Sequence, residues 1–228
     1  MKDIKEIGSK FQAIFEIWKG KRRFLYTENL TPGTSFFDEI LVKSEGKEFR
    51  EFNPSRSKLA SSVMNQISQI GLKRGDVVLY LGCSHGYTPS FVSDIVGMDG
   101  FVFAIDIAPR VVRDIVFICQ KRRNMTAILA DANQPESYAD KVCQVDFIYQ
   151  DIAQKNQAEI FLKNCNLYLK EGGFGFLALK ARSVDITKKP GQVFNEVRAL
   201  LDKGITVVDS RKLEPFQKDH CVFVCKKK

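Results

Sequence analysis

The chain has 228 residues, 44% of them hydrophobic, and 35 Lys and Arg against 27 Asp and Glu give it a net charge of +8. This length allows one sizeable core with a small appendage, and no stretch approaches the roughly 18 apolar residues of a membrane span. The start, "MKDIKEIGSKF", is charged and lacks the apolar region of a signal peptide, so we expect an intracellular protein with no membrane attachment.

The first 55 residues are expected to form a small β domain of two hairpins. Residues 11–18 and 22–30 flank a Lys-Gly-Lys turn, and residues 35–44 and 47–52 flank Glu45-Gly46. The Thr-Pro-Gly of residues 31–33 predicts the turn between the two hairpins.

A second domain is expected over residues 56–228. It begins with a helix over residues 57–70, because apolar residues recur there with helical spacing until Gly71. Strands and helices then alternate, which predicts an α/β fold with a mostly parallel sheet covered on both faces. The expected strands are residues 76–81, 101–105, 126–130, 145–150 and 173–180, with helices starting near Pro89, Pro109, Asn156 and Gly191. Residues 206–213 and 219–226 have no helix between them, so they are expected to form an antiparallel hairpin at one edge.

The six cysteines are scattered, with no C-x-x-C pair and no neighbouring histidine. We therefore expect buried free thiols of a reducing compartment and no bound metal. They are Cys83, Cys119, Cys143, Cys165, Cys221 and Cys225.

The turn after the first strand of the second domain reads Gly82-Cys-Ser-His-Gly86. A dinucleotide site would require G-x-G-x-x-G at the start of a helix, so this turn is a poor phosphate cradle. Its two glycines still allow a ligand to approach the backbone closely. The pattern favours a cofactor without phosphate.

Three carboxylates follow three neighbouring strands: Asp106, Asp131 and Asp151. An acidic residue at the end of the second strand typically binds ribose hydroxyls. A nucleoside with a positively charged sulfonium and an amino-acid tail suits this set, which indicates S-adenosylmethionine. The alternative is that each Asp caps the helix that follows it.

Four polar residues are expected to meet at one rim of the sheet. Lys180 ends the fifth strand beside Asp151, the antiparallel last strand starts with His220, and the helix that precedes the first strand starts near Lys58. Such convergence is typical of a catalytic site. Taken singly, Lys180 could be a strand end emerging into water, and His220 a structural histidine.

The chain resembles the fibrillarin family over nearly its whole length, most closely its shorter archaeal members. The stretches "TENLTPG", "NPSRSKLA", "VLYLG", "VSDIVG", "VDFIYQDIAQ", "LALKA" and "LEPFQKDH" occur in the family's order. This resemblance implies a Rossmann-like S-adenosylmethionine-dependent methyltransferase domain behind a small N-terminal β domain. It also implies 2′-O-methylation of ribose in rRNA, and in archaea also tRNA, at sites chosen by a box C/D guide RNA.

The partners that the resemblance implies are the guide and target RNA, a Nop-domain scaffold protein and a small kink-turn-binding protein of ribosomal type. The Gly/Arg-rich tail of eukaryotic members is missing. An archaeal and therefore cytoplasmic protein is expected.

The resemblance also assigns residues. Lys58, Asp151, Lys180 and His220 match the family's catalytic Lys-Asp-Lys-His group. The cofactor positions are Gly82, Gly86, Tyr87, Thr88, Asp106, Ile107, Asp131, Ala132, Asp151, Ile152, Ala153 and Gln154. The turn departs from the family's usual "LGAASGTT" because Tyr87 replaces a threonine, and Asp106 stands where glutamate is typical.

We expect in-line attack of a ribose 2′-oxygen on the sulfonium methyl, with Lys180 as base or as cation beside the developing alkoxide and Asp151 orienting it. Two alternatives remain at this point. One is a protein methyltransferase that modifies a glutamine side chain from the same cofactor site. The other is a non-catalytic subunit of an RNA particle.

Overall fold

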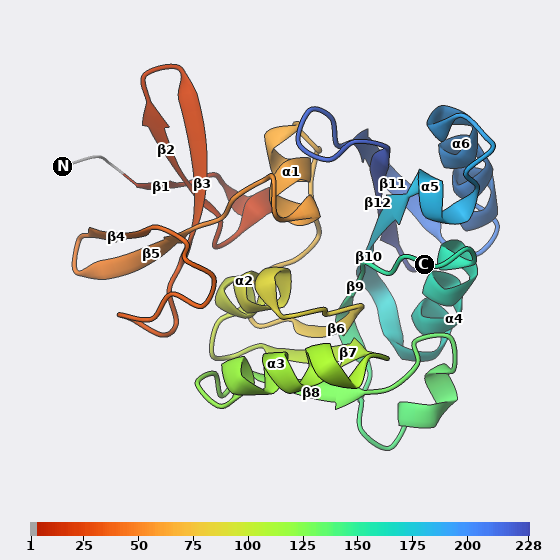
Figure 1. The fold of residues 1–228 in the computed structure, drawn as a ribbon, viewed down its shortest axis with the longest axis horizontal. Helices are drawn as coiled ribbons and strands as arrows, with labels where there is room; N and C mark the ends of the chain where they lie inside the picture. Colours follow the sequence, from red (N-terminus) through yellow and green to blue (C-terminus); the bar gives the residue numbers. More distant parts are fainter. Residues whose placement is uncertain (1–3) are drawn as a thin grey trace.

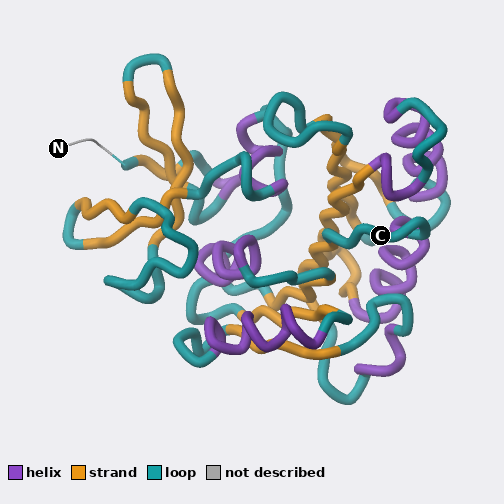
Figure 2. Tube along the Cα trace, viewed as in Figure 1, coloured by secondary structure: helices purple, strands orange, loops and turns teal. Residues whose placement is uncertain are grey.

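The computed structural model describes residues 4–228, which form two separate β-sheets (Figures 1 and 2). The smaller sheet is antiparallel, with strand order β1-β2-β3-β5-β4. Its strands are β1 (Lys5–Glu6), β2 (Phe15–Lys19), β3 (Arg22–Glu28), β4 (Leu41–Ser44) and β5 (Lys47–Glu51). The two predicted hairpins are thereby confirmed, while the predicted domain boundary at residues 55 and 56 falls in the connector after β5 and stays a prediction.

The larger sheet has seven strands in the order β11-β12-β10-β9-β6-β7-β8, and only β12 runs antiparallel to its neighbours β10 and β11. The strands are β6 (Val77–Leu81), β7 (Phe101–Asp106), β8 (Met125–Leu129), β9 (Val145–Gln150), β10 (Leu169–Lys180), β11 (Thr206–Lys212) and β12 (His220–Lys226). The chain winds outward from β6 to β8, then returns to β9 on the other side of β6. Ligands of such sheets bind at the carboxyl ends of the strands beside this switch of direction.

Helices cover both faces of the larger sheet (Figure 1). They are α1 (Lys58–Met64), α2 (Tyr87–Val96), α3 (Pro109–Cys119), α4 (Gln157–Tyr168), α5 (Ala181–Val184) and α6 (Pro190–Leu201), with short 3-10 turns at Ser9–Phe11 and Pro135–Tyr138. Successive strand residues point to opposite faces. Accordingly, Val78 and Tyr80 pack in one core with α1, α2 and α3, whereas Leu79 and Leu81 pack in another with α4 and α6.

Three predicted elements are shorter in the structure than expected. The strand predicted over residues 11–18 starts only at Phe15, after a 3-10 turn at Ser9–Phe11. The helix predicted over residues 57–70 ends at Met64, and Gln66 has a positive φ of 60° that a helix cannot continue. Ile67 and Ile70, which continue the helical spacing of apolar residues, are buried, but from a non-helical segment. The helical spacing of apolar residues therefore predicts the buried positions correctly but the length of α1 wrongly.

The strand predicted from residue 35 starts only at Leu41. The segment before it folds around the carboxylate of Glu39, which accepts hydrogen bonds from the backbone N–H groups of Phe36 and Phe37 and from the hydroxyl of Ser35. These local bonds occupy donors that a strand would direct to its neighbour. Neither β1 nor the short helix α5 was predicted from the sequence.

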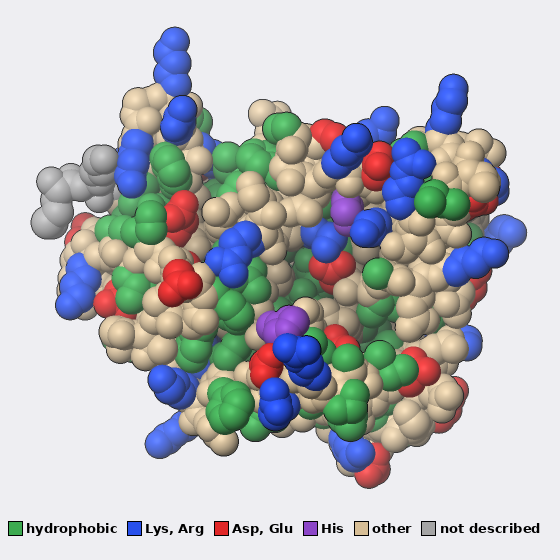
Figure 3. All heavy atoms as spheres, viewed as in Figure 1, with side chains coloured by type: hydrophobic (Ala, Val, Ile, Leu, Met, Phe, Trp, Pro, Cys, Tyr) green, Lys and Arg blue, Asp and Glu red, His purple; other side chains and the backbone are tan. Residues whose placement is uncertain are grey.

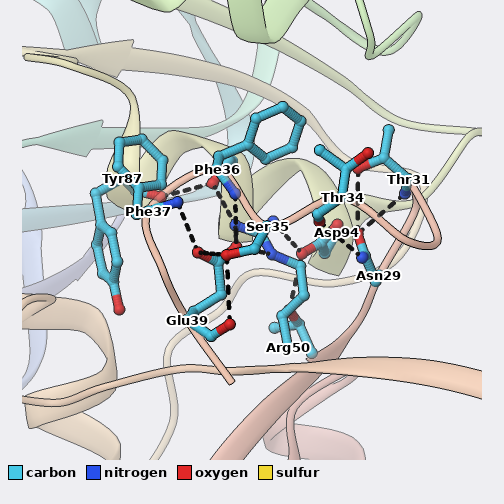
Figure 4. A network of polar contacts seen from close by, with 12 residues as sticks. Asn29, Thr31, Thr34, Ser35, Phe36, Phe37, Glu39, Arg50, Tyr87 and Asp94 are labelled. Carbon is cyan, nitrogen blue, oxygen red and sulfur yellow. Dashed lines mark hydrogen bonds and ion pairs between the residues drawn. The ribbon is translucent and has the colours of Figure 1, made fainter. Parts of the chain in front are cut away.

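A buried ionic cluster joins the smaller sheet to α2 and to the segment after α3 (Figure 4). Arg50 of β5 lies 2.7 Å from Glu39 and 2.9 Å from Asp94 of α2, and Arg122 lies 2.7 Å from Asp94. Thr27 of β3 donates a further hydrogen bond to Asp94 at 2.8 Å. We call Glu39, Arg50, Asp94 and Arg122 the junction cluster. Two cations face two carboxylates in it, so the buried charges balance.

The cysteines are free thiols, but the expectation that all are buried is wrong: Cys143 is exposed and Cys119 is half-buried. Burial raises the pKa of the Cys83 thiol above its usual range, which keeps it protonated. Within residues 4–228, no helix combines the length and apolarity that crossing a membrane requires.

Candidate active site

A cavity of about 890 Å³ opens where β6 ends and α2 begins. The turn after β6 contributes Gly82 to His85, the start of α2 contributes Tyr87 and Thr88, and Lys58 and Asp151 complete the inner wall. The face drawn in Figure 3 is hollowed near its centre, and basic, acidic and histidine side chains surround the hollow. The cavity therefore lies at the switch point of the sheet, where the fold places ligands.

A second cavity of about 250 Å³ adjoins the first and shares Gly82, Ser84 and Asp151 with it. It is formed at the ends of β7, β8 and β9, and its walls mix carboxylates with small apolar side chains. Its lining includes the predicted positions Asp106, Ile107, Asp131, Ala132, Ile152, Ala153 and Gln154. The structure thus gathers the predicted cofactor residues along one continuous site, except Gly86, which lines neither cavity.

Close packing inside the protein leaves no room for a side chain at either glycine of the turn. Gly82 has φ of 81°, and a Cβ there would lie 2.3 Å from the carbonyl oxygen of Asp151. A Cβ on Gly86 would lie 2.7 Å from Ile118 of α3. Gly82 therefore lets the turn and the strand-end loop of β9 approach each other, and Gly86 lets α2 pack on α3.

The carboxylate of Asp106 anchors the turn after β6 by a hydrogen bond. One of its carboxylate oxygens accepts the backbone N–H of Ser84 at 2.9 Å, and the other accepts that of Ala108 at 3.1 Å. Asp131 similarly accepts the N–H of Asn133 at 2.9 Å. Neither is a helix N-cap, since Ala108 precedes α3 and Gln134 precedes the 3-10 turn at Pro135–Tyr138. Both carboxylates keep free lone pairs for a ligand.

Two buried glutamines fix the loop that follows β9. Gln150 donates to the carbonyl of Gln157 at 2.6 Å, and Gln157 donates to the carbonyl of Gln154 at 2.7 Å. Both glutamine side chains are fully buried. They hold the loop that carries Asp151 to Gln154, and neither was predicted from the sequence to be functional.

Two of the four predicted catalytic residues, Lys58 and Asp151, line the larger cavity, whereas Lys180 and His220 lie near them but line neither cavity. Lys58, the first residue of α1, reaches Asp151 with 2.7 Å between Nζ and Oδ2, and both side chains keep about a quarter or less of their surface exposed, at 20% and 26%. Lys180 and His220 are paired residues of the antiparallel strands β10 and β12. Lys58, Asp151 and Lys180 all act electrostatically on His220. The predicted convergence is therefore present in the structure.

One detail differs from the expectation. Asp151 pairs with Lys58, whereas Lys180 is exposed and makes no ion pair within the part of the chain that the structure describes. The suggestion that Asp151 orients Lys180 directly is thus not what the structure shows. The carboxylate of Asp151 forms its ion pair with Lys58 instead. The ammonium group of Lys180 is therefore available to contact a bound molecule.

The surroundings of His220 favour its neutral form. Its Nδ1 lies 2.6 Å from the carbonyl oxygen of Lys218, so Nδ1 carries the hydrogen and Nε2 is left as an acceptor. Burial, followed by the positive charges of Lys58 and Lys180, holds the pKa of His220 below its usual value despite that hydrogen bond.

Tyr87, the unusual residue of the turn, faces the smaller sheet (Figure 4). Its ring packs edge-on against Phe37 at 5.3 Å, and the guanidinium of Arg56 lies 4.2 Å from its centroid. Phe36, Phe37 and Arg56 line the larger cavity as well, together with Phe117 and Lys121. None of these five was predicted from the sequence as a functional residue. Only Arg56 had a signal, because it stands two residues before Lys58.

Comparisons with known proteins identify related sequences and structures. The model of the Fibrillarin family matches residues 5–228. The fibrillarin-like rRNA/tRNA 2′-O-methyltransferase of Pyrococcus horikoshii is 47% identical over 220 residues, covering 96% of each chain.

Two solved structures are similar throughout. The fibrillarin of Aeropyrum pernix, in complex with natively bound S-adenosyl-L-methionine, is 35% identical with a TM-score of 0.87, covering 99% of this chain and 100% of that one. A fibrillarin from a fibrillarin/Nop5p complex is 33% identical with a TM-score of 0.82, covering 90% of this chain and 94% of that one.

Proposed function

Because this chain belongs to the fibrillarin family, we propose that it transfers a methyl group from S-adenosylmethionine to ribose 2′-hydroxyls of RNA. The observation that supports this most strongly is the meeting of Lys58, Asp151, Lys180 and His220 beside the cavity at the switch point of the sheet. The RNA targets that we propose are rRNA and tRNA, as in the name of the Pyrococcus horikoshii relative.

The residues fit the cofactor. Asp106 has free acceptor capacity for ribose hydroxyls, Ile107, Ala132 and Ile152 provide apolar surface for an adenine, and Asp131 lies beside them. The turn Gly82–Thr88 leads from this smaller cavity into the larger one. When bound, S-adenosylmethionine supplies an activated methyl group on a sulfonium.

The chain's own groups then act on the attacking hydroxyl. Lys58 holds Asp151 in place by its ion pair. Lys180, which lacks such a pair among the described residues, acts on the hydroxyl side as base or as cation, and neutral His220 offers Nε2 as an acceptor. Positioning the hydroxyl among these groups supplies a further part of the rate.

Guidance and partners belong to the same proposal. A fibrillarin was crystallised with Nop5p, which supports a Nop-domain scaffold as partner here. A box C/D guide RNA and a kink-turn-binding protein complete the proposed particle. The cytoplasmic location stays a prediction.

The test is methyl transfer from labelled S-adenosylmethionine to a guided target RNA, with and without scaffold and kink-turn proteins. We expect transfer at the guided nucleotide in the assembled sample. Lys180→Ala should reduce the rate by about 10²–10⁴-fold with unchanged cofactor affinity, because proton transfer and charge stabilisation contribute on that order. Lys180→Arg keeps a cation but no base at neutral pH, so it separates the two roles.

The matched control is Lys170→Ala, at the opposite end of the same strand β10. Its rate should equal that of the unmodified protein. Transfer to protein but not to RNA would replace this proposal with a protein methyltransferase, and binding of no cofactor would leave a non-catalytic subunit.

A further inference from the structure

The segment between β11 and β12 leads directly into His220, the first residue of β12. The N–H of Leu213 donates to the carbonyl of His220 at 3.0 Å, and the N–H of Gln217 donates to the carbonyl of Leu213 at 2.9 Å. The side-chain amide of Gln217 also donates to the carbonyl of Ser55 at 2.6 Å, in the stretch that leads to Lys58. The segment is thus anchored on the side of the active site from which Lys58 comes.

Asp219, the last residue of this segment, has a positive φ of 58°, in the left-handed region that residues other than glycine seldom adopt. The φ of a residue sets the orientation of the peptide group before it, here the one that joins Lys218 to Asp219. In extended backbone φ is about −120° to −140°, so that peptide group would be turned by about half a rotation. The carbonyl of Lys218, which accepts the hydrogen of His220 Nδ1 at 2.6 Å, would then no longer face the imidazole.

Three hydrogen bonds hold Asp219 in this conformation. Its backbone N–H donates to the carboxylate of Glu214 at 3.2 Å, and its carbonyl accepts the N–H of Ala181 at 3.0 Å. Its carboxylate, of which 19% is exposed, accepts the Nε–H of Arg182 at 3.2 Å. Ala181 and Arg182 directly follow Lys180 at the end of β10. The residues next to one predicted catalytic side chain therefore restrain the residue next to another.

The charges around His220 do not select its tautomer. Lys58, Lys180 and Asp151 act on its pKa, so they bias the choice between the neutral and the protonated imidazole. Which nitrogen of the neutral ring carries the hydrogen is set by the hydrogen bond that the other nitrogen leaves open, and here Nδ1 has a carbonyl partner. With the hydrogen on Nε2 instead, that atom could no longer accept one from a ligand.

We propose that Asp219 and Arg182 are positioning residues that keep the hydrogen of neutral His220 on Nδ1 and so preserve Nε2 as an acceptor toward the substrate hydroxyl. Neither residue lines a cavity of the active site, so both act through His220. The inference rests on the proposed function, because it assumes that Nε2 meets a ribose hydroxyl.

Nitrogen-15 NMR of the cofactor-loaded protein at about pH 8, where His220 is neutral, distinguishes the two tautomers. The chain has two histidines, so His85→Gln assigns the signals. We expect the Nδ1–H form alone in the unmodified protein. Asp219→Ala removes both the carboxylate and the tolerance of a positive φ, so both tautomers should appear. Asp219→Asn keeps an acceptor and this tolerance, and should keep the Nδ1–H form.

Arg182→Gln removes the ion pair from the exposed side and should also admit the Nε2–H form, whereas Arg182→Lys restores the charge and most of the Nδ1–H form. The matched control is Lys188→Gln, because this lysine of the same loop pairs with Glu196 at 2.8 Å and not with Asp219. Its spectrum should equal that of the unmodified protein.

Methyl transfer by the assembled particle should fall by about 10²-fold in Asp219→Ala, the cost of misplacing a reacting group by roughly 1 Å, with unchanged affinity for S-adenosylmethionine. Asp219→Asn and Lys188→Gln should keep their rate. An Nε2–H form in the unmodified protein would overturn the proposal, as would an unchanged tautomer in Asp219→Ala and Arg182→Gln. Absence of methyl transfer to RNA by the unmodified protein would instead contradict the proposed function, since the NMR measurement needs no RNA.

Discussion

The chain contains two groups of cations and carboxylates, and burial separates their roles. In the junction cluster, the side chains of Arg50, Asp94 and Arg122 are all 0% exposed, and each charge is met by another or by a hydroxyl. In the active site, the ion pair of Lys58 and Asp151 stays partly open to solvent. Similar side chains thus serve as a structural link where they are closed off, and as reactive groups where one side faces a cavity.

Disrupting the buried junction cluster should have the largest effect on stability. Asp94→Asn removes the carboxylate that faces two buried guanidinium groups, and an unpaired buried charge costs about 3–5 kcal/mol. Urea unfolding is expected to show this loss in the free energy of unfolding. Asp151→Asn is the matched control, with a loss below about 1 kcal/mol; equal losses in the two variants would remove the distinction drawn between the groups.

A carboxylate that lines a cavity should affect the binding of a ligand more than the stability of the fold. Asp106→Ala is expected to weaken binding of S-adenosylmethionine by about 1–3 kcal/mol, because ribose hydroxyls lose a charged acceptor. Titration calorimetry measures this. Asp140→Ala, an exposed carboxylate outside both cavities, serves as control and should bind normally.

The open ion pair itself should contribute little stability. Lys58→Met is expected to change the free energy of unfolding by less than about 1 kcal/mol, since partly exposed pairs are screened by solvent. The same variant should lose most methyl transfer, because Asp151 is no longer held. Full activity in this variant would exclude Lys58 from the mechanism.

The smallest expected effect is a dependence on pH. The pKa of His220 is lowered in the folded protein, first by burial and then by Lys58 and Lys180. The unfolded chain therefore binds a proton below about pH 6.5 before the folded protein does, so stability falls as pH drops from there to the lowered pKa. His220→Asn should remove this part of the slope in unfolding experiments, and NMR titration should show the pKa of His220 rising in Lys58→Met.

The sequence predicts the sheet and the meeting of the catalytic residues because both follow from topology. Parallel strands bring Asp106, Asp131 and Asp151 to one edge, and an antiparallel last strand brings His220 there. The length of α1 was not predictable in this way, because Ile67 and Ile70 keep helical spacing while their backbone does not.

The junction cluster was missed for a similar reason. Asp94 stands in the apolar run "SFVSDIVG", and its partners lie 44 residues earlier and 28 residues later in the chain. A carboxylate in an apolar helix indicates a buried partner without identifying it. The aromatic wall of Phe36 and Phe37 likewise depended on Glu39 folding its own loop, which no strand-like pattern of residues 35–40 reveals.

The junction cluster also determines how the chain can be taken apart. Cutting between residues 55 and 56 would leave Arg50 and Glu39 on one fragment and Asp94 and Arg122 on the other. Each fragment would then expose charged side chains that had lost ion pairs and hydrogen bonds to the other. The two sheets are therefore not interchangeable modules. A chimera that takes its first sheet from a relative will fold as one cooperative unit only if the donor supplies partners for Asp94.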